Sequence, residues 1–231
     1  ARPRRLLTSR LARRWAHRLR RFLGVRRGLS VDGVYYKELS PESLQRALSR
    51  RGVGHKDYRV TFPDGTKQII RCSREHIFAD LMGPVGVDRL EQLLPLVRPG
   101  SRVLEFGAGT GYRANWLSFV VGPSGGIVAI ADDPADVQFA QRRYSRSNIA
   151  FERAEDFGLA GETDGAFDGV VVLSPPPEED MRRTLLAELW RLTADGGVML
   201  VGLSDTVDAR LGATLAKLTR EAGAELRIQA P

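Results

Sequence analysis

The stretch that decides the fold is Val103-Leu104-Glu105-Phe106-Gly107-Ala108-Gly109-Thr110-Gly111-Tyr112. An apolar run, glycines at every second position and a following amphipathic run predict a strand, a tight turn and the start of a helix. Gly107 lets the chain leave the strand sharply, Gly109 lets a ligand approach the backbone, and Gly111 allows close helix packing. We therefore interpret residues 107–111, called here the glycine loop, as a ligand-binding turn.

The glycine spacing separates two classes of cofactor. A dinucleotide fingerprint requires Gly-x-Gly-x-x-Gly, but the residue three positions after Gly109 is Tyr112. The pattern Glu-x-Gly-x-Gly-x-Gly instead resembles the first motif of class I S-adenosylmethionine-dependent methyltransferases. That resemblance implies S-adenosyl-L-methionine as the cofactor, bound by Glu105, Gly107, Ala108, Gly109 and Gly111. The alternative interpretation is a glycine-rich turn that binds no ligand.

Strands and helices alternate through the rest of the chain. Strands are expected at 102–106, 127–131, 148–151, 167–173 and 198–203, and helices at 112–121, 134–144 and 180–192. A helix over 206–222 and a strand over 225–228, beside the fifth strand, are expected to follow. With right-handed crossovers, this order predicts an α/β fold with a doubly wound, Rossmann-like, mostly parallel sheet and helices on both faces. Ligands bind at the carboxyl ends of such strands, where the glycine loop lies.

The resemblance also implies two acidic contacts to the cofactor. In the family, an acid at the end of the second strand accepts hydrogen bonds from both ribose hydroxyls. Here Ala131 stands at that position, so a shift of one residue would assign the contact to Asp132. After the third strand, Glu155 falls at the family's adenine-contacting acid, with Asp156 as second choice. A solvated loop charge is the alternative for each.

The turn after the fourth strand begins with Ser174, followed by the stiff run 175–177 of three prolines. It resembles the motif of amino-group methylases in the same class, but Pro177 replaces their stacking aromatic. Methylation of a nucleobase or a glutamine amide is therefore disfavoured. Ser174 is assigned to the cofactor site, where it would orient a substrate. The alternative is that the prolines only end the strand. A sulfonium methyl is already activated, so no catalytic base is assigned.

Positive charge is concentrated at the start of the chain. The net charge is +7, and residues 1–31 hold eleven arginines and no acid; removing these 11 from the 35 basic residues leaves 24 against 28 acidic ones. Apolar residues recur at helical spacing within this segment, at Leu7, Leu11, Trp15 and Leu19. Residues 1–28 are thus predicted to form a basic amphipathic helix. It would bind an anionic membrane surface or nucleic acid, act as an organelle presequence, or pack on the domain.

Three regions are expected. Residues 1–28 form the basic extension, 29–99 a small α+β cap, and 100–231 the methyltransferase domain. The cap contains a β-hairpin, 58–62 with 67–71, around a Pro-Asp-Gly turn, together with short helices. It would cover the cofactor and shape a substrate pocket, or serve only as scaffold.

Composition excludes several classes of function. Cys72 is the only cysteine, so no intrachain disulfide forms, and the three histidines share no metal-ligand spacing. No run approaches the roughly 18 apolar residues of a membrane span, and the charged start lacks a secretory core. We expect a cytoplasmic protein, or one peripheral to a membrane, that uses no metal. The predicted function is methyl transfer to a small-molecule acceptor. The alternatives are a non-catalytic module of the same fold and an RNA methyltransferase.

Overall fold

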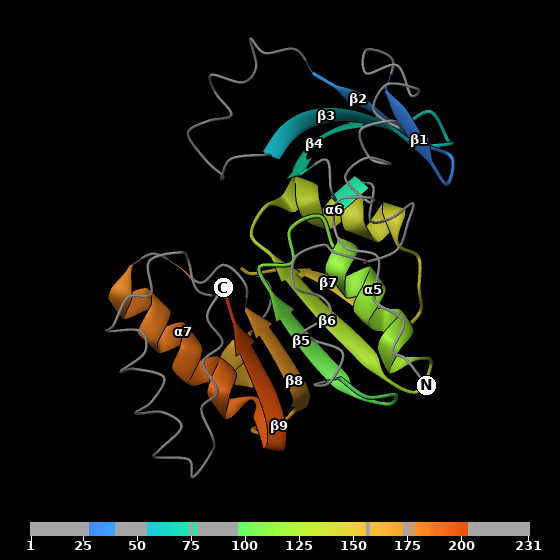
Figure 1. Ribbon diagram of the computed structural model, residues 1–231. Helices are drawn as coiled ribbons and strands as arrows, with labels where there is room; N and C mark the ends of the chain where they lie inside the picture. Colours follow the sequence, from blue (N-terminus) through green and yellow to red (C-terminus); the bar gives the residue numbers. More distant parts are fainter. Residues whose placement is uncertain are drawn as a thin grey trace, which may run out of the picture. The chain divides into compact units, whose positions relative to one another are not determined.

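The computed structural model describes residues 28–39, 55–73, 76–77, 97–155, 158–172, 176 and 178–202. The chain divides into two compact units, residues 1–77 and 78–231. Each unit has its own sheet among the described residues (Figure 1).

The sheet of the first unit is an antiparallel meander in the order β1-β2-β3-β4. Its strands are β1 (Leu29–Val31), β2 (Val34–Glu38), β3 (His55–Thr61) and β4 (Lys67–Ser73). The predicted hairpin is confirmed as β3 and β4, and its turn is closed by a bond from Phe62 N to Thr66 O of 2.9 Å. Alternate side chains such as Tyr36, Val60 and Ile70 are buried. One face of this sheet therefore packs into a core, as period-two alternation requires.

The hairpin of β1 and β2 was not predicted from the sequence. It turns at Asp32 and Gly33, which both have positive φ, 48° and 78°. Two successive positive φ values define a type I′ turn, for which Asp-Gly is a preferred pair. The three-residue length of β1 hid this strand, although the turn signal was present.

The sheet of the second unit is parallel, in the order β7-β6-β5-β8-β9. Its strands are β5 (Arg102–Phe106), β6 (Gly126–Ala131), β7 (Ile149–Arg153), β8 (Phe167–Val172) and β9 (Thr193–Val201). The connecting helices are α5 (Tyr112–Val121), α6 (Pro134–Arg143), α7 (Glu179–Arg191) and the short 3-10 helix η2 (Leu159–Gly161). The predicted doubly wound, Rossmann-like sheet is thereby confirmed.

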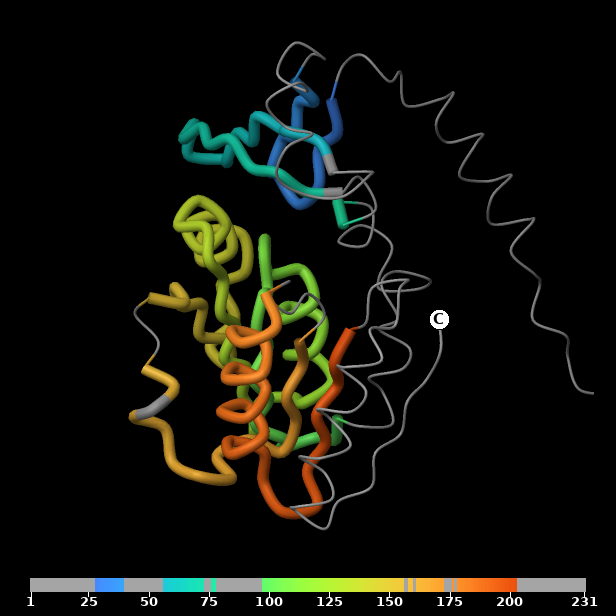
Figure 2. Tube along the Cα trace, turned by 90° about the vertical axis from the view of Figure 1, so that its left-hand side faces the viewer, coloured from blue at the N-terminus to red at the C-terminus, as the bar shows by residue number. Residues whose placement is uncertain are grey.

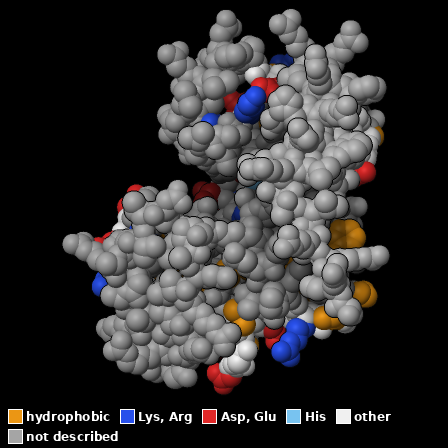
Figure 3. Space-filling model, viewed as in Figure 1, with side chains coloured by type: hydrophobic (Ala, Val, Ile, Leu, Met, Phe, Trp, Pro, Cys, Tyr) orange, Lys and Arg blue, Asp and Glu red, His pale blue; other side chains and the backbone are white. Residues whose placement is uncertain are grey.

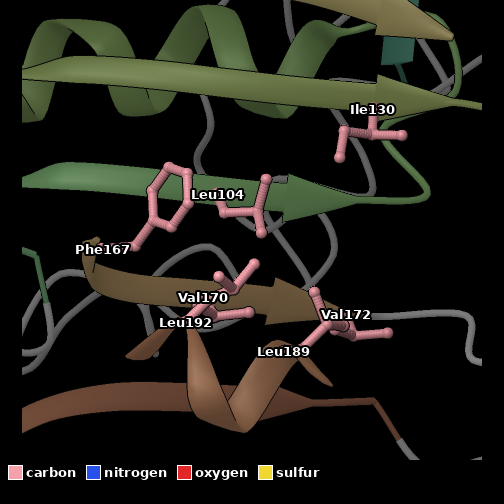
Figure 4. Close-up of a cluster of buried hydrophobic side chains, with 7 residues drawn as sticks. All are labelled: Leu104, Ile130, Phe167, Val170, Val172, Leu189 and Leu192. Atoms are coloured by element: carbon pink, nitrogen blue, oxygen red, sulfur yellow. The ribbon is translucent and has the colours of Figure 1, made fainter. Parts of the chain in front are cut away.

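Helices cover both faces of this sheet. The right-handed crossovers place α5 and α6 on one face and α7 on the other, as Figures 1 and 2 show. Beneath α7, apolar side chains from β5, β6, β8 and the helix meet in a cluster (Figure 4). Its members are Leu104, Ile130, Phe167, Val170, Val172, Leu189 and Leu192.

Strand β9 begins earlier than predicted. The sequence placed a turn at 195–197 and a strand from residue 198, but β9 starts at Thr193. The register passes from Phe167–Thr193 to Gly169–Val198, so four residues of β9 oppose one of β8. This bulge accommodates Gly196, whose φ is 74°. The predicted turn is therefore an irregularity within the strand.

Arg191, the last residue of α7, fixes the connection between β7 and β8. Its guanidinium donates to the carbonyl oxygens of Leu159 at 2.8 Å and Glu162 at 3.0 Å, and to Asp164 Oδ1 at 2.5 Å. The hydrogen bond to Asp164, followed by that to Glu188, raises the already high pKa of Arg191. The side chain therefore stays charged and holds this connection against the helix.

Several expectations lie outside the described residues. These are the basic helix over the first 27 residues, the cap helices beginning near residues 40 and 87, and the helix and strand after residue 206. Within the described ranges, no helix is both long and apolar enough to cross a membrane. On the face of the molecule shown in Figure 3, the acidic, basic and apolar side chains of the described residues lie in small separate areas.

Candidate functional site

The carboxyl ends of the parallel strands bring four connections to one edge of the sheet. Phe106, the last residue of β5, pairs with Ile130 of β6 and Val172 of β8, and Ala131 pairs with Arg153 of β7. The chain runs outward from β5 through β6 and β7, and then crosses back to β8 and β9. The glycine loop follows β5 and so lies at the point where the strand order reverses. Open α/β sheets bind their ligands at this point.

The glycine loop has a backbone that requires glycine. Gly107, Gly109 and Gly111 have φ values of 79°, 54° and 78°. Residues other than glycine rarely adopt this left-handed region of backbone conformation. The N–H groups of Gly107 and Ala108 both donate to the carbonyl of Ile130, at 3.0 and 2.8 Å. These bonds fix the loop over the end of β6.

The two halves of the loop differ in what surrounds them. A β-carbon on Gly111 would lie 2.6 Å from Phe151 Cε1 and 2.9 Å from the β-carbon of Ala140. One on Gly107 would meet no atom of the described residues within 4 Å, and one on Gly109 would meet only Asp136 Oδ2, at 3.9 Å. Gly111 therefore packs against β7 and α6, whereas Gly107 and Gly109 leave room for a ligand to approach the backbone.

Glu105 is fully buried beneath the loop and pairs with Arg113 of α5. Arg113 Nε donates to Glu105 Oε1 at 2.6 Å, and Arg113 Nη2 donates to the carbonyl of Gly107 at 3.2 Å. The pair neutralises the carboxylate and ties the first glycine to the helix. Sequence reasoning named Glu105 but missed Arg113. The signal was available, because Arg113 precedes buried Leu117 by four residues and so lies on the buried stripe of α5.

The start of α5 is buried and has no side-chain cap. Gly111 is its N-cap and contributes no side-chain hydrogen bond, and the first turn contains no acidic residue. The first N–H groups of a helix have no partner within the helix and favour negative charge. A carboxylate on a ligand in the glycine loop would find donors here.

The acids that follow β6 occupy different environments. Ala131, at the end of the strand, is buried, and Asp132 is exposed. Asp133 caps α6, with its Oδ1 accepting a hydrogen bond from Ala135 N at 2.9 Å. Asp136, in the first turn of α6, is only 2% exposed. Sequence reasoning missed Asp136, although its spacing from Phe139 and Ala140 places it on the buried stripe of α6.

The other predicted site residues are either exposed to solvent or outside the described residues. The side chain of Glu155 is 77% exposed and forms an ion pair with Arg153. Asp156 and Ser174 lie outside the described residues. The cofactor contacts assigned from the sequence all stay predictions: Glu105, Gly107, Ala108, Gly109, Gly111, Asp132, Glu155, Asp156 and Ser174. Among the residues that the structure describes, no group of three or more His, Cys, Asp or Glu side chains is arranged to hold a metal ion.

A parallel sheet of this order, with a Glu-x-Gly-x-Gly-x-Gly loop at its switch point, has the architecture of the class I S-adenosylmethionine-dependent methyltransferases. The family model of protein-L-isoaspartate(D-aspartate) O-methyltransferase matches residues 74–202. The chain belongs to this family, whose members use S-adenosylmethionine.

Curated relatives agree with this assignment. Protein-L-isoaspartate O-methyltransferase 1 of Marinobacter nauticus is 31% identical over 125 residues, which cover 54% of each protein. The protein-L-isoaspartate O-methyltransferase of Yersinia pestis is 29% identical over 154 residues, 66% of this chain and 65% of that protein. An arsenite methyltransferase of Aquipseudomonas alcaligenes is 29% identical over 115 residues, 45% of this chain and 32% of that enzyme. The chain thus spans from about a third to just under two thirds of the length of these relatives.

Proposed function

We propose that this chain transfers a methyl group from S-adenosylmethionine to a carboxylate of a protein acceptor, of the isoaspartyl type named by its family. The observation that supports this most strongly is the glycine loop, left-handed at three glycines and open at Gly107 and Gly109, at the switch point of the sheet. The acceptor class rests on the family and its relatives. It replaces the small-molecule acceptor expected from the sequence.

The described residues fit the cofactor. The backbone at Gly107 and Gly109 would lie against it, and the uncapped N–H groups of α5 would receive its carboxylate. An acid near the end of β6 would hold the ribose, with Asp132 the assignment from the sequence, and Glu155 would lie near the adenine. When bound, S-adenosylmethionine supplies a methyl group already activated by its sulfonium.

A carboxylate acceptor needs no general base. A carboxyl group with an ordinary pKa of about 4 is ionised at neutral pH, so its oxygen is a nucleophile without losing a proton. The chain then has only to orient the acceptor and exclude water.

The arsenite methyltransferase relative does not favour arsenic as the acceptor. Trivalent arsenic is a soft centre that binds thiolates. Cys72 is the only cysteine of this sequence, and it is buried in β4 at 3% exposure. This chain therefore offers no set of thiolates to hold arsenic.

The proposal is tested with S-adenosylmethionine carrying a radiolabelled methyl group. The acceptors are an isoaspartyl peptide, the same peptide with ordinary aspartate, and total RNA. We expect base-labile label in the isoaspartyl peptide alone. Label in RNA would instead support the RNA methyltransferase alternative. Binding of the cofactor without label in any acceptor would refute the proposed acceptor class while leaving the cofactor assignment intact.

A further inference from the structure

The sheet of the first unit has one face that its core does not use. Strand alternation sends Tyr36, Val60 and Ile70 inward, where they are buried, and sends the residues between them outward. We propose that this outward face, called here the basic face, binds single-stranded nucleic acid, with its cations on the phosphates and Tyr35 stacked on a base. The proposal concerns binding alone and is independent of the methyl transfer proposed above.

Cations predominate on the basic face. Two cross-strand rows make up its centre, Lys37–Arg59–Ile69 and Tyr35–Thr61–Lys67. The three cations of these rows are exposed to solvent. Among the described strand residues of this face the only acid is Asp57, which lies in the next row and pairs with Arg71 at 3.9 Å. Asp32 and Asp64 lie in the two hairpin turns. The central rows therefore present positive charge without an acid between them.

The pairing of Lys37 with Arg59 is unfavourable in the unbound protein. The two residues stand directly opposite one another on adjacent antiparallel strands. Like charges in this position, with β-carbons about 4.5 to 5.5 Å apart, destabilise a sheet. Within the described part of the chain neither side chain forms an ion pair, whereas Lys56, on the other face of β3, pairs with Glu38. An anion bound between Lys37 and Arg59 would remove the repulsion.

Single-stranded nucleic acid fits this face better than other anions do. Its phosphates bind cations, and its bases stack on exposed rings. Tyr35 is 37% exposed in the row beside Lys37, and Ile69, 55% exposed, adds apolar surface beside Arg59. An acidic peptide would use the cations but not the ring, and a membrane would require an apolar surface that enters the lipid. The arginine-rich residues 1–27 lead directly into β1, so the adjoining chain carries charge of the same sign.

The test is a fluorescence anisotropy titration of the full chain with a labelled single-stranded RNA of mixed sequence at several salt concentrations. Each phosphate neutralised on a single strand contributes about 0.7 to the slope of log K against log salt. The double variant Lys37→Gln, Arg59→Gln should therefore reduce that slope by about 1.4 and weaken binding about tenfold or more at low salt. Its melting temperature should not fall, because a repulsive pair is removed. The matched control, Lys56→Gln with Arg183→Gln, removes the same charge from other surfaces and should leave the slope unchanged.

A second pair of variants separates stacking from charge. Tyr35→Leu should weaken RNA binding about fivefold to a hundredfold, the loss of one stacked base, and leave the salt slope unchanged. Tyr35→Phe keeps the ring and should bind RNA within about twofold of the wild type. The ring also lies against Gly28, where a β-carbon would be 2.6 Å from its Cζ. The melting temperature of each variant therefore shows whether the sheet is intact, and Tyr35→Phe retains this contact.

Four other outcomes would overturn the proposal. Equal losses of RNA affinity in the double variant and its control would mean that binding is spread over all the positive charge of the chain. Binding of poly-glutamate as tight as that of RNA would indicate an acidic protein partner. Binding to phosphatidylserine vesicles but not to RNA would assign the face to a membrane. No binding of RNA by the wild type would refute the proposal outright. None of these results bears on S-adenosylhomocysteine binding, which is measured separately and tests the proposed function.

Discussion

The glycine loop has a packed half and an open half. In the packed half, Gly111 touches β7 and α6, and Arg113 lies against the buried Glu105. In the open half, a β-carbon on Gly107 would meet no atom of the described residues within 4 Å, and one on Gly109 would meet only Asp136 Oδ2. All three glycines share the same left-handed backbone, so their conformation does not distinguish them. Their surroundings do, and we expect the packed half to determine stability and the open half to determine ligand affinity.

The largest expected effect is on the packed half, at the buried ion pair. Arg113→Met leaves the Glu105 carboxylate without its guanidinium partner at 0% exposure. Removing one member of a buried pair lowers the free energy of unfolding by about 3 to 5 kcal/mol. Urea unfolding measures this loss.

An exposed pair provides the control for that variant. Arg183 lies 3.3 Å from Asp180, and both side chains are largely exposed. Arg183→Met should therefore change the free energy of unfolding by less than about 1 kcal/mol. Equal losses in the free energy of unfolding would show that burial does not make the Glu105–Arg113 pair more important for stability than an exposed pair.

A smaller loss of stability is expected from Gly111→Ala. The added methyl group meets Phe151 and Ala140 at distances that require a shift, and the φ of 78° strains any side chain. Overpacking costs about 1 to 3 kcal/mol, and the left-handed backbone adds about 1 to 2 kcal/mol. Gly196→Ala, with a φ of 74° and open surroundings among the described residues, carries the strain of a positive φ alone. In thermal unfolding, Gly111→Ala should have a lower melting temperature than this control variant. The reverse order would contradict the packing argument.

The smallest effect concerns an exposed acid beside the site. Glu155 is 77% exposed and already paired with Arg153, so any bond it makes to the cofactor competes with water. Glu155→Ala should weaken S-adenosylhomocysteine binding about threefold, in line with the modest net value of an exposed hydrogen bond. Fluorescence titration is sufficient. A loss above thirtyfold would mean that this acid is enclosed when the cofactor binds.

Much of the second unit was predictable from local sequence. Helix α5 and strand β5 fall at the predicted residues, because an apolar strand and three glycines define both ends of the turn between them. The start of β9 was misplaced because a bulge holds Gly196 inside a strand, and in sequence this glycine looks like a turn. Strand β1 was missed because three residues show too little alternation.

The site was only partly predictable, for a physical reason. Backbone requirements identify the glycines, since few other residues tolerate their conformation. Arg113 and Asp136 are polar residues on buried stripes, and the hydrogen bonds of Arg113 cross from α5 to Glu105 and Gly107. Such a residue is ordinarily taken as solvated. Its spacing from Leu117 or Ala140, read against the apolar stripe, is the signal that distinguishes it.

The most direct test of the central claim is a calorimetric titration of the wild type and Gly109→Ala with S-adenosylhomocysteine. The added β-carbon lies 3.9 Å from Asp136 Oδ2, an ordinary contact, so the variant should be no less stable than Gly196→Ala, which also has a positive φ and open surroundings among the described residues. We predict one-to-one binding by the wild type and affinity at least about tenfold lower for Gly109→Ala, a difference of about 1.4 kcal/mol, because the methyl group occupies space needed by the ligand. No binding by the wild type at millimolar concentration, or equal binding by both proteins, would contradict the assignment of the open half of the glycine loop as the cofactor site.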